Sequence, residues 1–315
     1  MKQLFLIIGF LGYHSYTHSA INCKSPSGKA VDWFILYKLP RFRNDKVRTT
    51  GNEFFYMDED NQCFKRTRAR DISRRALAFD KNTGFWIISS IPRFPAKADG
   101  GYIFADQQLP YGQIALCVTV LQSEKNQIVG REQATTSMRK HFKTKKGNSV
   151  EVFAKSASFG KDIYDDLISP GLNDKIHVQT WRPDLANTNK VWNIDYIDFG
   201  NGISYKASLD HSKWAVAKHQ PFTCIGDINR QRTQFKRGGL SLCLENENVA
   251  ESFRNLYSEI EKKKLPRKTC PESAFPPAGR ANAPVTGVGV VACEARPLVR
   301  RWGRTFENGT TKDAG

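Results

Sequence analysis

Apolar residues along this chain gather in short runs rich in β-branched and aromatic side chains, and turn-forming residues separate the runs. Such runs are typical of β-strands, and prolines or glycines between them mark the connections. The segment 80–84 has the composition of a tight turn. The strands that the pattern predicts cover residues 31–40, 54–58, 76–80, 84–91, 111–120, 176–181 and 192–197. In 176–181 the faces alternate, so we expect His177 to be a structural or surface histidine.

Helical periodicity is confined to two stretches. Residues 162–168 place Ile163, Leu167 and Ile168 at helical spacing, which predicts a short helix. In 251–264 four apolar side chains fall on one helical face and predict an amphipathic helix. Those four residues are Phe253, Leu256, Tyr257 and Ile260. A chain with many strands and few helices is expected to adopt an α/β fold of the mixed α+β kind.

The first 20 residues have the layout of a secretory signal peptide, with a lysine, an apolar run at 4–11, and small or polar residues up to Ala20. The run is too short to cross a membrane. We therefore expect a soluble product of the secretory pathway that is extracellular, with a lysosomal destination left open. Seven cysteines suit an oxidising compartment, and their odd number leaves at least one thiol unpaired or shared with another chain. The sequence has no Cys-x-x-Cys pair, which argues against a zinc site.

The chain is strongly basic, with 48 Lys and Arg residues, 31 Asp and Glu residues and a formal net charge of +17. This charge suits a polyanionic partner such as nucleic acid, a heparin-like glycan or an anionic membrane surface, and simple solubility is the alternative. The densest basic run, 139–146, lies in a polar segment at 122–148 that is either a solvated connector or a nucleic-acid contact. Residues 266–315 are rich in Pro, Gly, Ala and Arg and are expected to form a loosely ordered extension that contains the sequon 308–310.

Candidate chemistry centres on Asp210-His211-Ser212-Lys213-Trp214. In an extended strand His211 and Lys213 share one face, so an imidazole and an ammonium group can converge on one phosphate. The imidazole can attack or protonate while the ammonium neutralises the phosphoryl oxygens. The chain has six histidines among many basic residues, so such a pair also arises by chance, as at 141–143. A surface or ordinary hydrogen-bonding role for His211 is the alternative.

A degraded copy of the same motif lies upstream. Residues 72–78 align with 211–217, and residues 85–93 align with 222–230, in the same order and at nearly the same spacing. The alignment indicates a duplicated unit. In the first copy Ile72 stands in place of the histidine and Arg74 in place of the lysine.

Several stretches together resemble the deoxyribonuclease II family, in consistent order from about Cys23 to Cys243. The stretches are 31–40, 85–95, 111–113, 153–156, 159–162, 210–214, 223–227 and 237–239. The resemblance implies a fold similar to phospholipase D, in which two pseudo-symmetric halves each give a His-x-Lys motif to one interfacial site. It also implies cleavage of DNA at acid pH without a metal ion or other cofactor, which leaves a 3′-phosphate and a 5′-hydroxyl.

In the mechanism that the resemblance implies, a neutral imidazole attacks phosphorus and a protonated imidazole delivers a proton to the departing 5′-oxygen. His211 and Lys213 carry over as the second motif, and Asn229 matches a polar position beside the phosphate. The first motif does not carry over, because its histidine falls on Ile72, its lysine on Arg74 and an asparagine of this half on Arg93. An isoleucine cannot attack phosphorus or transfer a proton, whereas the two arginines can still bind phosphate.

The resemblance places one half at 21–121 and the other at 149–265, joined by the basic connector 122–148. It implies disulfides Cys23–Cys117 and Cys224–Cys243, leaves Cys63 over, and suggests Cys270–Cys293 only as a guess. Between Cys117 and Phe153 this chain is shorter than members of the family. Each disulfide is expected to contribute about 2–4 kcal/mol to stability.

Three hypotheses follow from the sequence. The first is an acid endonuclease of the deoxyribonuclease II class with weakened or lost turnover, and the second is a catalytically inactive, secreted DNA-binding protein. The third is a basic effector that binds another polyanion. For DNA we expect sequence-independent binding through phosphates, without a metal ion and without membrane insertion. The sequence leaves the oligomeric state open.

Overall fold

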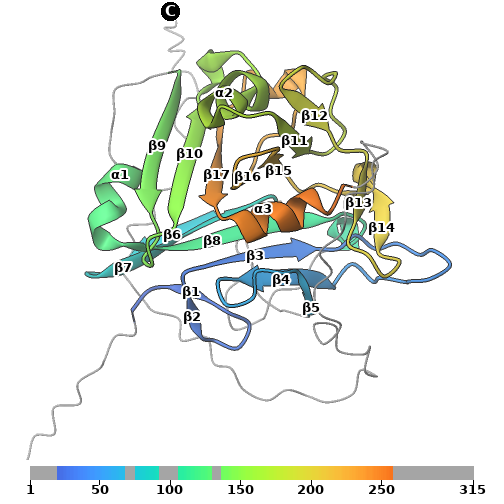
Figure 1. The fold of residues 1–315 in the computed structure, drawn as a ribbon, viewed down its shortest axis with the longest axis horizontal. Helices are drawn as coiled ribbons and strands as arrows, with labels where there is room; N and C mark the ends of the chain where they lie inside the picture. The colour runs from blue at the N-terminus through green and yellow to red at the C-terminus, as the bar shows by residue number, and fades with distance from the viewer. Residues whose placement is uncertain (1–19, 68–74, 92–105, 130–135, 258–315) are drawn as a thin grey trace, which may run out of the picture.

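Two large β-sheets dominate the structure, a computed structural model that describes residues 20–67, 75–91, 106–129 and 136–257 (Figure 1). The helices are short. They are the α-helices Lys125–Val129 (α1), Ser169–Leu172 (α2) and Glu247–Arg254 (α3), the π-helix Tyr164–Ile168, and short 3₁₀ turns such as Asp106–Gln108 and Arg232–Gln234. The mixed α/β fold expected from the sequence is confirmed, and it is rich in sheet.

The first sheet has six strands in the order β5-β4-β3-β8-β7-β6, and every neighbouring pair is antiparallel. Its strands are β3 (Trp33–Lys38), β4 (Phe54–Asp58), β5 (Lys65–Thr67), β6 (Arg75–Phe79), β7 (Thr83–Ser89) and β8 (Gln113–Leu121). A small hairpin of β1 (Cys23–Lys24) and β2 (Ala30–Val31) precedes them. The expected turn at 80–84 is present, because the Asp80 carboxylate accepts hydrogen bonds from the backbone amides of Asn82 and Thr83.

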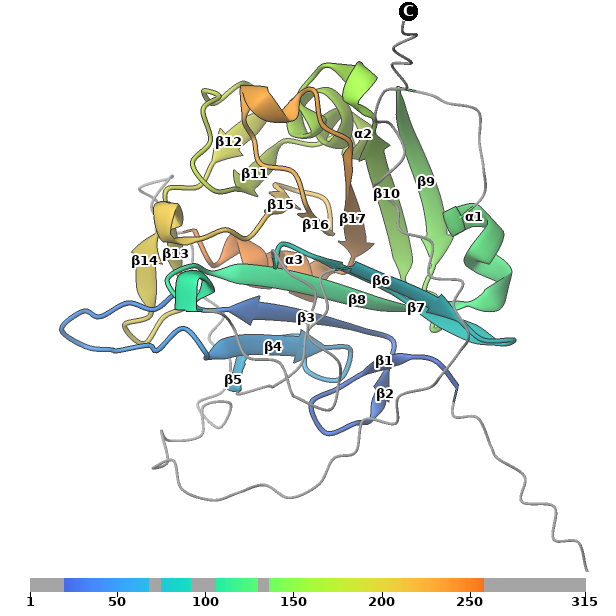
Figure 2. The same cartoon turned by 180° about the vertical axis from the view of Figure 1, so that it is seen from behind.

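The second sheet has seven strands in the order β12-β11-β15-β16-β17-β10-β9, and only the β11–β12 pair is parallel among these described strands. Its strands are β9 (Ser137–Lys143), β10 (Ser149–Lys155), β11 (Ile176–Gln179), β12 (Val191–Asn193), β15 (Trp214–Ala217), β16 (Phe222–Gly226) and β17 (Gly239–Glu245). A separate hairpin joins β13 (Tyr196–Asp198) to β14 (Ser204–Lys206). Seen from behind, the hairpin lies beside the end of the first sheet (Figure 2).

The two sheets share a strand order, which fits the duplicated unit read from the sequence. The run β6-β7-β8-β3 in the first sheet matches β15-β16-β17-β10 in the second, and each neighbouring pair is antiparallel in both. The strand beside this run is β4 in one half, which follows β3, and β9 in the other, which precedes β10. The finer comparison with the phospholipase D fold stays a prediction.

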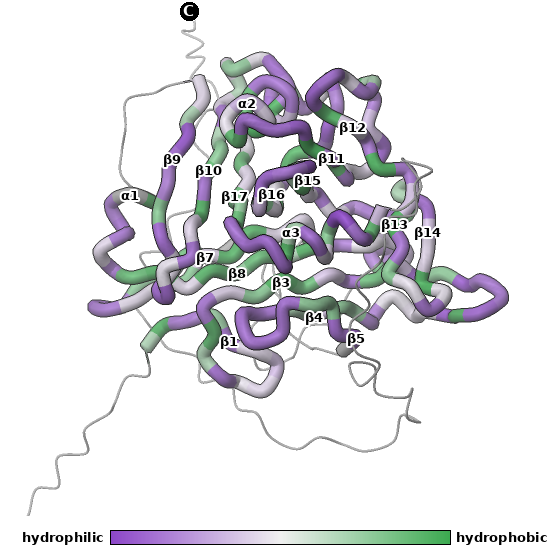
Figure 3. Tube along the Cα trace, viewed as in Figure 1, coloured by the Kyte–Doolittle hydropathy of each residue, from purple (hydrophilic) through white to green (hydrophobic). Residues whose placement is uncertain are grey.

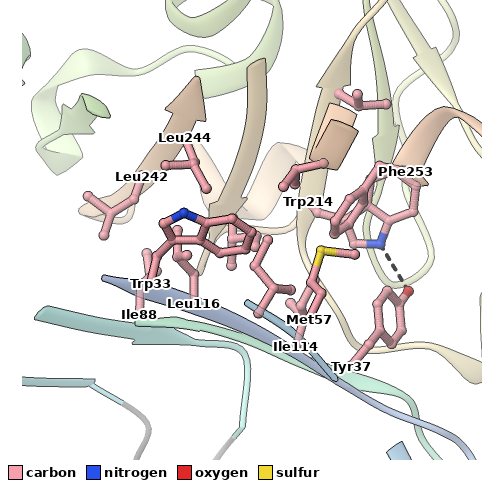
Figure 4. Close-up of a cluster of buried hydrophobic side chains, with 14 of the residues drawn as sticks. Trp33, Tyr37, Met57, Ile88, Ile114, Leu116, Trp214, Leu242, Leu244 and Phe253 are labelled. Atoms are coloured by element: carbon pink, nitrogen blue, oxygen red, sulfur yellow. Dashed lines mark hydrogen bonds between the residues drawn. The ribbon is translucent and has the colours of Figure 1, made fainter. Parts of the chain in front are cut away.

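One core joins the two halves, because the sheets pack face to face (Figure 4). Trp33 and Leu116 from the first sheet meet Trp214, Leu242 and Leu244 from the second, and all are buried. Burial of one such side chain stabilises the fold by about 1.5–3 kcal/mol. Along the chain trace the apolar positions follow the strands between the sheets, and the connecting loops are mostly hydrophilic (Figure 3).

Both disulfides implied by the family resemblance are present, Cys23–Cys117 and Cys224–Cys243. The first ties the N-terminal hairpin to β8, and the second links β16 to β17 where Cys224 faces Cys243 in the strand register. Cys63 is a free cysteine. The guessed pair Cys270–Cys293 lies outside the described residues.

The basic segment 122–148, expected to be either a solvated connector or a nucleic-acid contact, contains α1 and the edge strand β9 in its described part. In β9 the side chains of Met138, Lys140 and Phe142 alternate with more exposed neighbours, so the segment has a strand pattern. The high charge hides this alternation, because lysine can contribute its alkyl stem to an inner face and keep its ammonium in water.

Other predictions need smaller corrections. Helix α3 begins at Glu247, earlier than expected, because Asn246 caps it by accepting a hydrogen bond from the Val249 amide. All four residues of β11 are buried, so of the two roles expected for His177 the structural one applies and the surface one does not; its Nδ1 lies 3.1 Å from the Tyr257 hydroxyl. The stretch expected as one strand at 192–197 forms two, β12 and β13. The helix expected at 162–168 is present as the π-helix and continues into α2.

Several predictions fall outside the described residues. They concern the signal peptide up to residue 19, the first-motif positions Ile72, Arg74 and Arg93, the stretch 258–264 of the expected helix, and the extension 266–315 with its sequon. Across the described part of the chain, no helix has both the length and the apolar character needed to cross a membrane.

Candidate active site

A fully buried carboxylate, that of Asp210, holds the His211 segment in place. Its Oδ2 accepts hydrogen bonds from the hydroxyls of Tyr37 (2.9 Å) and Tyr205 (3.1 Å), and its Oδ1 accepts one from the Ser212 amide (2.6 Å). The Tyr37 oxygen also lies 2.8 Å from the Ser212 hydroxyl and accepts a hydrogen bond from the Trp214 indole (Figure 4). Because Tyr37 belongs to β3, the first half holds the motif of the second half in place.

Burial raises the pKa of Asp210, and the hydrogen bonds that it accepts from Ser212, Tyr37 and Tyr205 oppose this rise. A buried carboxylate is tolerated only when its lone pairs are satisfied, as they are here. The network therefore fixes the backbone on either side of His211. The His211 segment is not part of a regular strand: an isolated bridge pairs Asp210 with Gly112, and β15 begins only at Trp214. The motif therefore lies just before the strand in which we expected it.

Gly112, next to β8, makes the seam between the halves. It forms a parallel β-bridge with Asp210. Its amide donates a hydrogen bond to Leu209 O, its carbonyl oxygen accepts one from the His211 amide, and each of these bonds is 2.9 Å long. A Cβ atom at this position would lie 2.4 Å from Asp210 Oδ2. Only glycine therefore lets the two chain segments approach this closely.

The imidazole of His211 is half-buried between two aromatic rings. The Tyr111 ring stacks on it with a centroid distance of 3.8 Å and an interplanar angle of 17°, and the Trp181 ring lies 4.5 Å away at 57°. Tyr111 comes from the loop before β8 in the first half, and Trp181 follows β11 in the second. The imidazole is thus held in one orientation by groups from both halves.

The pKa of His211 is lowered to about 4, chiefly by burial and then by the positive charges of Lys213, Arg182 and Lys38. An imidazole with this pKa is neutral at pH 5 and above. A neutral imidazole has a lone pair that can attack phosphorus or accept a proton, whereas it is a poor proton donor. The environment therefore suits His211 to act as a nucleophile or general base and not as a general acid.

Two cations flank the imidazole. The Lys213 ammonium donates a hydrogen bond to the His211 carbonyl oxygen over 2.8 Å, which keeps the charge beside the ring. Arg182 is exposed and its guanidinium lies 5.0 Å from the Trp181 ring centroid, a cation–π geometry. Its backbone has φ of 46°, the left-handed region that a non-glycine residue rarely adopts. Such strain clusters at functional sites and marks the Trp181-Arg182 turn.

The buried polar atoms without a hydrogen-bond partner among the described residues include His211 Nε2, Trp181 Nε1 and Asn229 Oδ1. Gln231 links two of the residues that carry these atoms. Its side-chain amide donates hydrogen bonds to the carbonyl oxygens of Trp181 and Arg182, and its backbone amide donates one to Asn229 O. Unsatisfied buried polar groups cost free energy unless a ligand, a water molecule or a movement satisfies them. These three atoms could therefore hydrogen-bond to a polar ligand beside His211.

The predicted residues thus divide into two groups. His211, Lys213 and Asn229 lie in one region of the second half, whereas Ile72, Arg74 and Arg93 lie outside the described residues. No second described histidine reaches His211. His141 is on the edge strand β9 beside Glu151, and His177 on β11 stacks on Tyr257. Within the described chain, no group of His, Cys, Asp and Glu side chains is arranged to hold a metal ion.

Sequence reasoning missed Trp181, Arg182 and Lys38. Trp181 was assigned only to the end of a strand. Lys38 was assigned to the apolar run 31–40, and a lysine inside such a run was the signal that could have drawn attention to it. Tyr111 was noted for its family resemblance, but the stacking on His211 depends on how the halves pack.

The described chain is a strand-rich fold of two packed sheets, with a histidine–lysine motif where the two sheets meet. The profile of the family Deoxyribonuclease II matches residues 22–76, 72–136 and 124–263, which together span most of the chain. The chain therefore belongs to the deoxyribonuclease II family.

Individual relatives agree with this assignment. Plancitoxin-1 of Acanthaster planci is 27% identical over 333 residues, which cover 78% of this chain and 93% of the relative. Cell death-related nuclease 6 of Caenorhabditis elegans is 28% identical over 357 residues, covering 82% and 93%. Deoxyribonuclease-2-alpha of Rattus norvegicus is 26% identical over 327 residues, covering 75% and 93%. All three alignments are longer than the 315 residues of this chain, so the relatives contain segments that it lacks.

Proposed function

We propose that this protein is a deoxyribonuclease II-like endonuclease that binds DNA through its phosphates and hydrolyses the phosphodiester without a metal ion, and that its turnover is weak or lost. The observation that carries the proposal is the neutral, oriented imidazole of His211 with the Lys213 and Arg182 charges beside it. Family membership supplies the substrate class, since the relatives include deoxyribonucleases by name. The weak turnover follows from Ile72.

The role that fits His211 is that of the neutral partner. At pH 5 its lone pair can attack phosphorus, so that a P–N bond forms while the bond to the 5′-oxygen breaks, and water then hydrolyses the phosphohistidine to a 3′-phosphate. Lys213 would neutralise charge on the phosphoryl oxygens. The 5′-oxygen must take a proton as it leaves, and Ile72 stands where the family has the second histidine. The missing function is therefore general acid catalysis, worth about 10²–10⁴-fold.

Phosphate binding draws on several groups in this proposal. Arg74 and Arg93 would hold phosphate from the first half, and Asn229 would lie beside it. The unpartnered indole N–H of Trp181 adds a donor that the family resemblance did not indicate. The charge of +17 favours contacts to the backbone of DNA and not to the base edges. Affinity for a duplex oligonucleotide should therefore fall at least about tenfold between 50 and 200 mM salt.

The proposal includes secretion. Residues 1–20 would be removed as a signal peptide, and the halves 21–121 and 149–265 would meet at the site. Disulfides Cys23–Cys117 and Cys224–Cys243 suit an oxidising compartment, extracellular or lysosomal. Mass spectrometry of protein collected from the medium of expressing cells checks this, with a mature N-terminus near Ile21 as the expected result. Recovery of an uncleaved chain only from the cytoplasm would contradict it.

The second candidate function is a catalytically inactive DNA-binding protein. The observation that favours it is again Ile72, since an isoleucine has no proton to transfer and phosphodiester hydrolysis without catalysis is extremely slow. A competition experiment distinguishes DNA binding from binding of another polyanion. If heparin resembles the natural ligand, it should displace labelled duplex DNA at a lower concentration of negative charge than unlabelled DNA does.

Plasmid nicking at about pH 5 with a chelator present tests the proposal. The purified secreted protein is compared with His211→Ala and with Ile72→His plus Arg74→Lys. Weak nicking by the wild type that His211→Ala abolishes, together with faster nicking by the double variant, is the expected result. Wild-type nicking that survives in His211→Ala would refute the assignment of His211.

If the wild type is inert and the double variant nicks DNA, the lesion lies in the first motif and the chain is an inactive family member. If neither nicks but both bind DNA in a salt-dependent manner, the second candidate function holds. Circular dichroism of each variant, with Cys224 and Cys243 intact, excludes misfolding as the cause of lost activity.

A further inference from the structure

Lys38 and Lys155 occupy equivalent places in the two halves. Lys38 is the last residue of β3 and pairs with Gln113, the first residue of β8; Lys155 is the last residue of β10 and pairs with Gly239, the first residue of β17. Both are buried, with side chains 0% and 5% exposed. A buried lysine is rare, and two at matching positions of a repeated unit indicate a shared task.

Each ammonium group is enclosed by backbone carbonyls of the loop that leads into the paired strand. Lys38 Nζ donates to the carbonyl oxygens of Tyr111 (2.8 Å), Leu39 (3.1 Å) and Gln108 (3.2 Å), with Leu109 O at 3.5 Å. Lys155 Nζ donates to Arg237 (2.6 Å), Phe235 (2.9 Å) and Gln234 (3.0 Å). Carbonyl oxygens that face the interior of the protein need hydrogen-bond donors, and a single ammonium group supplies three.

The loop held by Lys38 is the one that reaches His211. Tyr111 stacks its ring on the imidazole, and Gly112 accepts the hydrogen bond of the His211 amide. Lys38 therefore acts on His211 through one intermediate residue. We propose that Lys38 is a positioning residue, whose ammonium group holds loop 108–112 so that Tyr111 stays stacked on His211, and whose deprotonation loosens that loop. The catalytic consequence rests on the proposed nuclease function; the structural consequence does not.

The charge of Lys38 explains why its hold on loop 108–112 depends on pH. An ammonium has three N–H donors, whereas the neutral amine has two and directs a lone pair at the surrounding carbonyl oxygens. Burial lowers the pKa of Lys38 to about 7, while the charges of Asp210 and Glu53 oppose this, and the charge of Lys38 in turn acts on His211. Lys38 is thus half deprotonated at about pH 7 and almost fully protonated one pH unit lower, whereas His211 is almost fully neutral one pH unit above its pKa of about 4. Both conditions are met only in a weakly acid range.

Histidine ring NMR of the full-length mature protein tests the proposal without requiring turnover. The His211 signal is assigned as the one absent from His211→Gln. Stacking on Tyr111 shifts the ring protons upfield, and we expect that shift to be nearly constant from about pH 5 to 6 and to decrease with a midpoint near pH 7. In Lys38→Met it should be reduced at every pH, and nicking, where present, should fall by about 10²-fold, as misplacement of a catalytic group does.

Lys155→Met is the matched control, because it removes the equivalent buried ammonium from the other loop. It should lower the melting temperature comparably and leave the His211 shift and its pH profile as in the wild type. A His211 shift that is flat to pH 8.5 in the wild type would overturn the proposal, even if Lys38→Met fails to fold. An unchanged shift in folded Lys38→Met would do the same. Absence of nicking in every variant would refute only the nuclease function.

Discussion

Gly112 and Asp210 form a backbone bridge at a distance that leaves no room for a side chain on Gly112. The bridge joins the loop before β8 to the segment that carries His211, and it is where the first half meets the chemistry of the second. The Asp210 carboxylate, which holds the His211 segment in place, thus also requires glycine at position 112.

Gly112→Ala should destabilise the protein by about 1–3 kcal/mol, because the new methyl group would overlap the Asp210 carboxylate, which is fixed by three donors. Urea unfolding measures the loss. Gly238→Ala is the matched control, since Gly238 precedes β17 as Gly112 precedes β8, and a Cβ there would be at an ordinary 3.5 Å from Lys155 O. Equal stability of the two variants would contradict the close packing at Gly112.

His211 should make stability depend on pH in the acid range. Its pKa is about 4 in the folded protein and about 6.5 when unfolded, so between these values the unfolded chain binds more protons. Stability from the neutral histidine is complete above about pH 6.5 and is lost as pH falls toward 4. Because the ring is only half-buried, screening reduces the effect to about 1 kcal/mol.

The measurement is the free energy of unfolding of wild type and His211→Gln at pH 7 and pH 4.5. The difference between the two proteins should shift by about 1 kcal/mol in favour of the variant at the lower pH. Asp210 and the other carboxylates are common to both proteins, so their titration largely cancels. A difference that is independent of pH would show that the histidine is not desolvated in the fold.

The two disulfides should differ in their contribution to stability. Cys23–Cys117 closes a loop with a sequence separation of 94, and Cys224–Cys243 one of 19. Restriction of the unfolded chain predicts about 4.5 kcal/mol for the longer loop and about 3 kcal/mol for the shorter. Unfolding of Cys23→Ser plus Cys117→Ser and of Cys224→Ser plus Cys243→Ser compares them. A larger loss from the second pair would mean that the link between β16 and β17 acts mainly in the folded state.

Much of the fold was accessible from sequence because its strands are runs of β-branched and aromatic residues that need burial on a sheet. Segment 139–146 misled us, since its charge masks the alternation that ends in buried Phe142. The shift of α3 has a local cause, the cap at Asn246, which lies before the apolar face that defined the helix. Local signals of this kind can be read once they are looked for.

The site was accessible only in part. His211, Lys213 and Asn229 stood out as a motif with a family resemblance, but a motif does not show what surrounds it. The stack of Tyr111 on His211 and the grip of Lys38 on the Tyr111 loop join positions far apart in sequence, through two sheets that must first pack together. The π-faces and carbonyls that orient the imidazole are therefore properties of the assembled halves.

Trp181→Phe should separate the indole N–H from the aromatic ring. The N–H is buried without a partner among the described residues, and the ring lies against His211. Phenylalanine keeps a ring beside the imidazole and removes only the donor, so the melting temperature should change little.

If the N–H binds a phosphoryl oxygen, nicking by the Ile72→His plus Arg74→Lys background should fall by about 10²-fold, the typical effect of losing one such donor. Trp192→Phe, whose ring contacts His177 and not His211, should leave nicking unchanged. Equal rates for Trp181→Phe and its background would show that the indole is part of the wall of the site and that the phosphate is held by the cations alone.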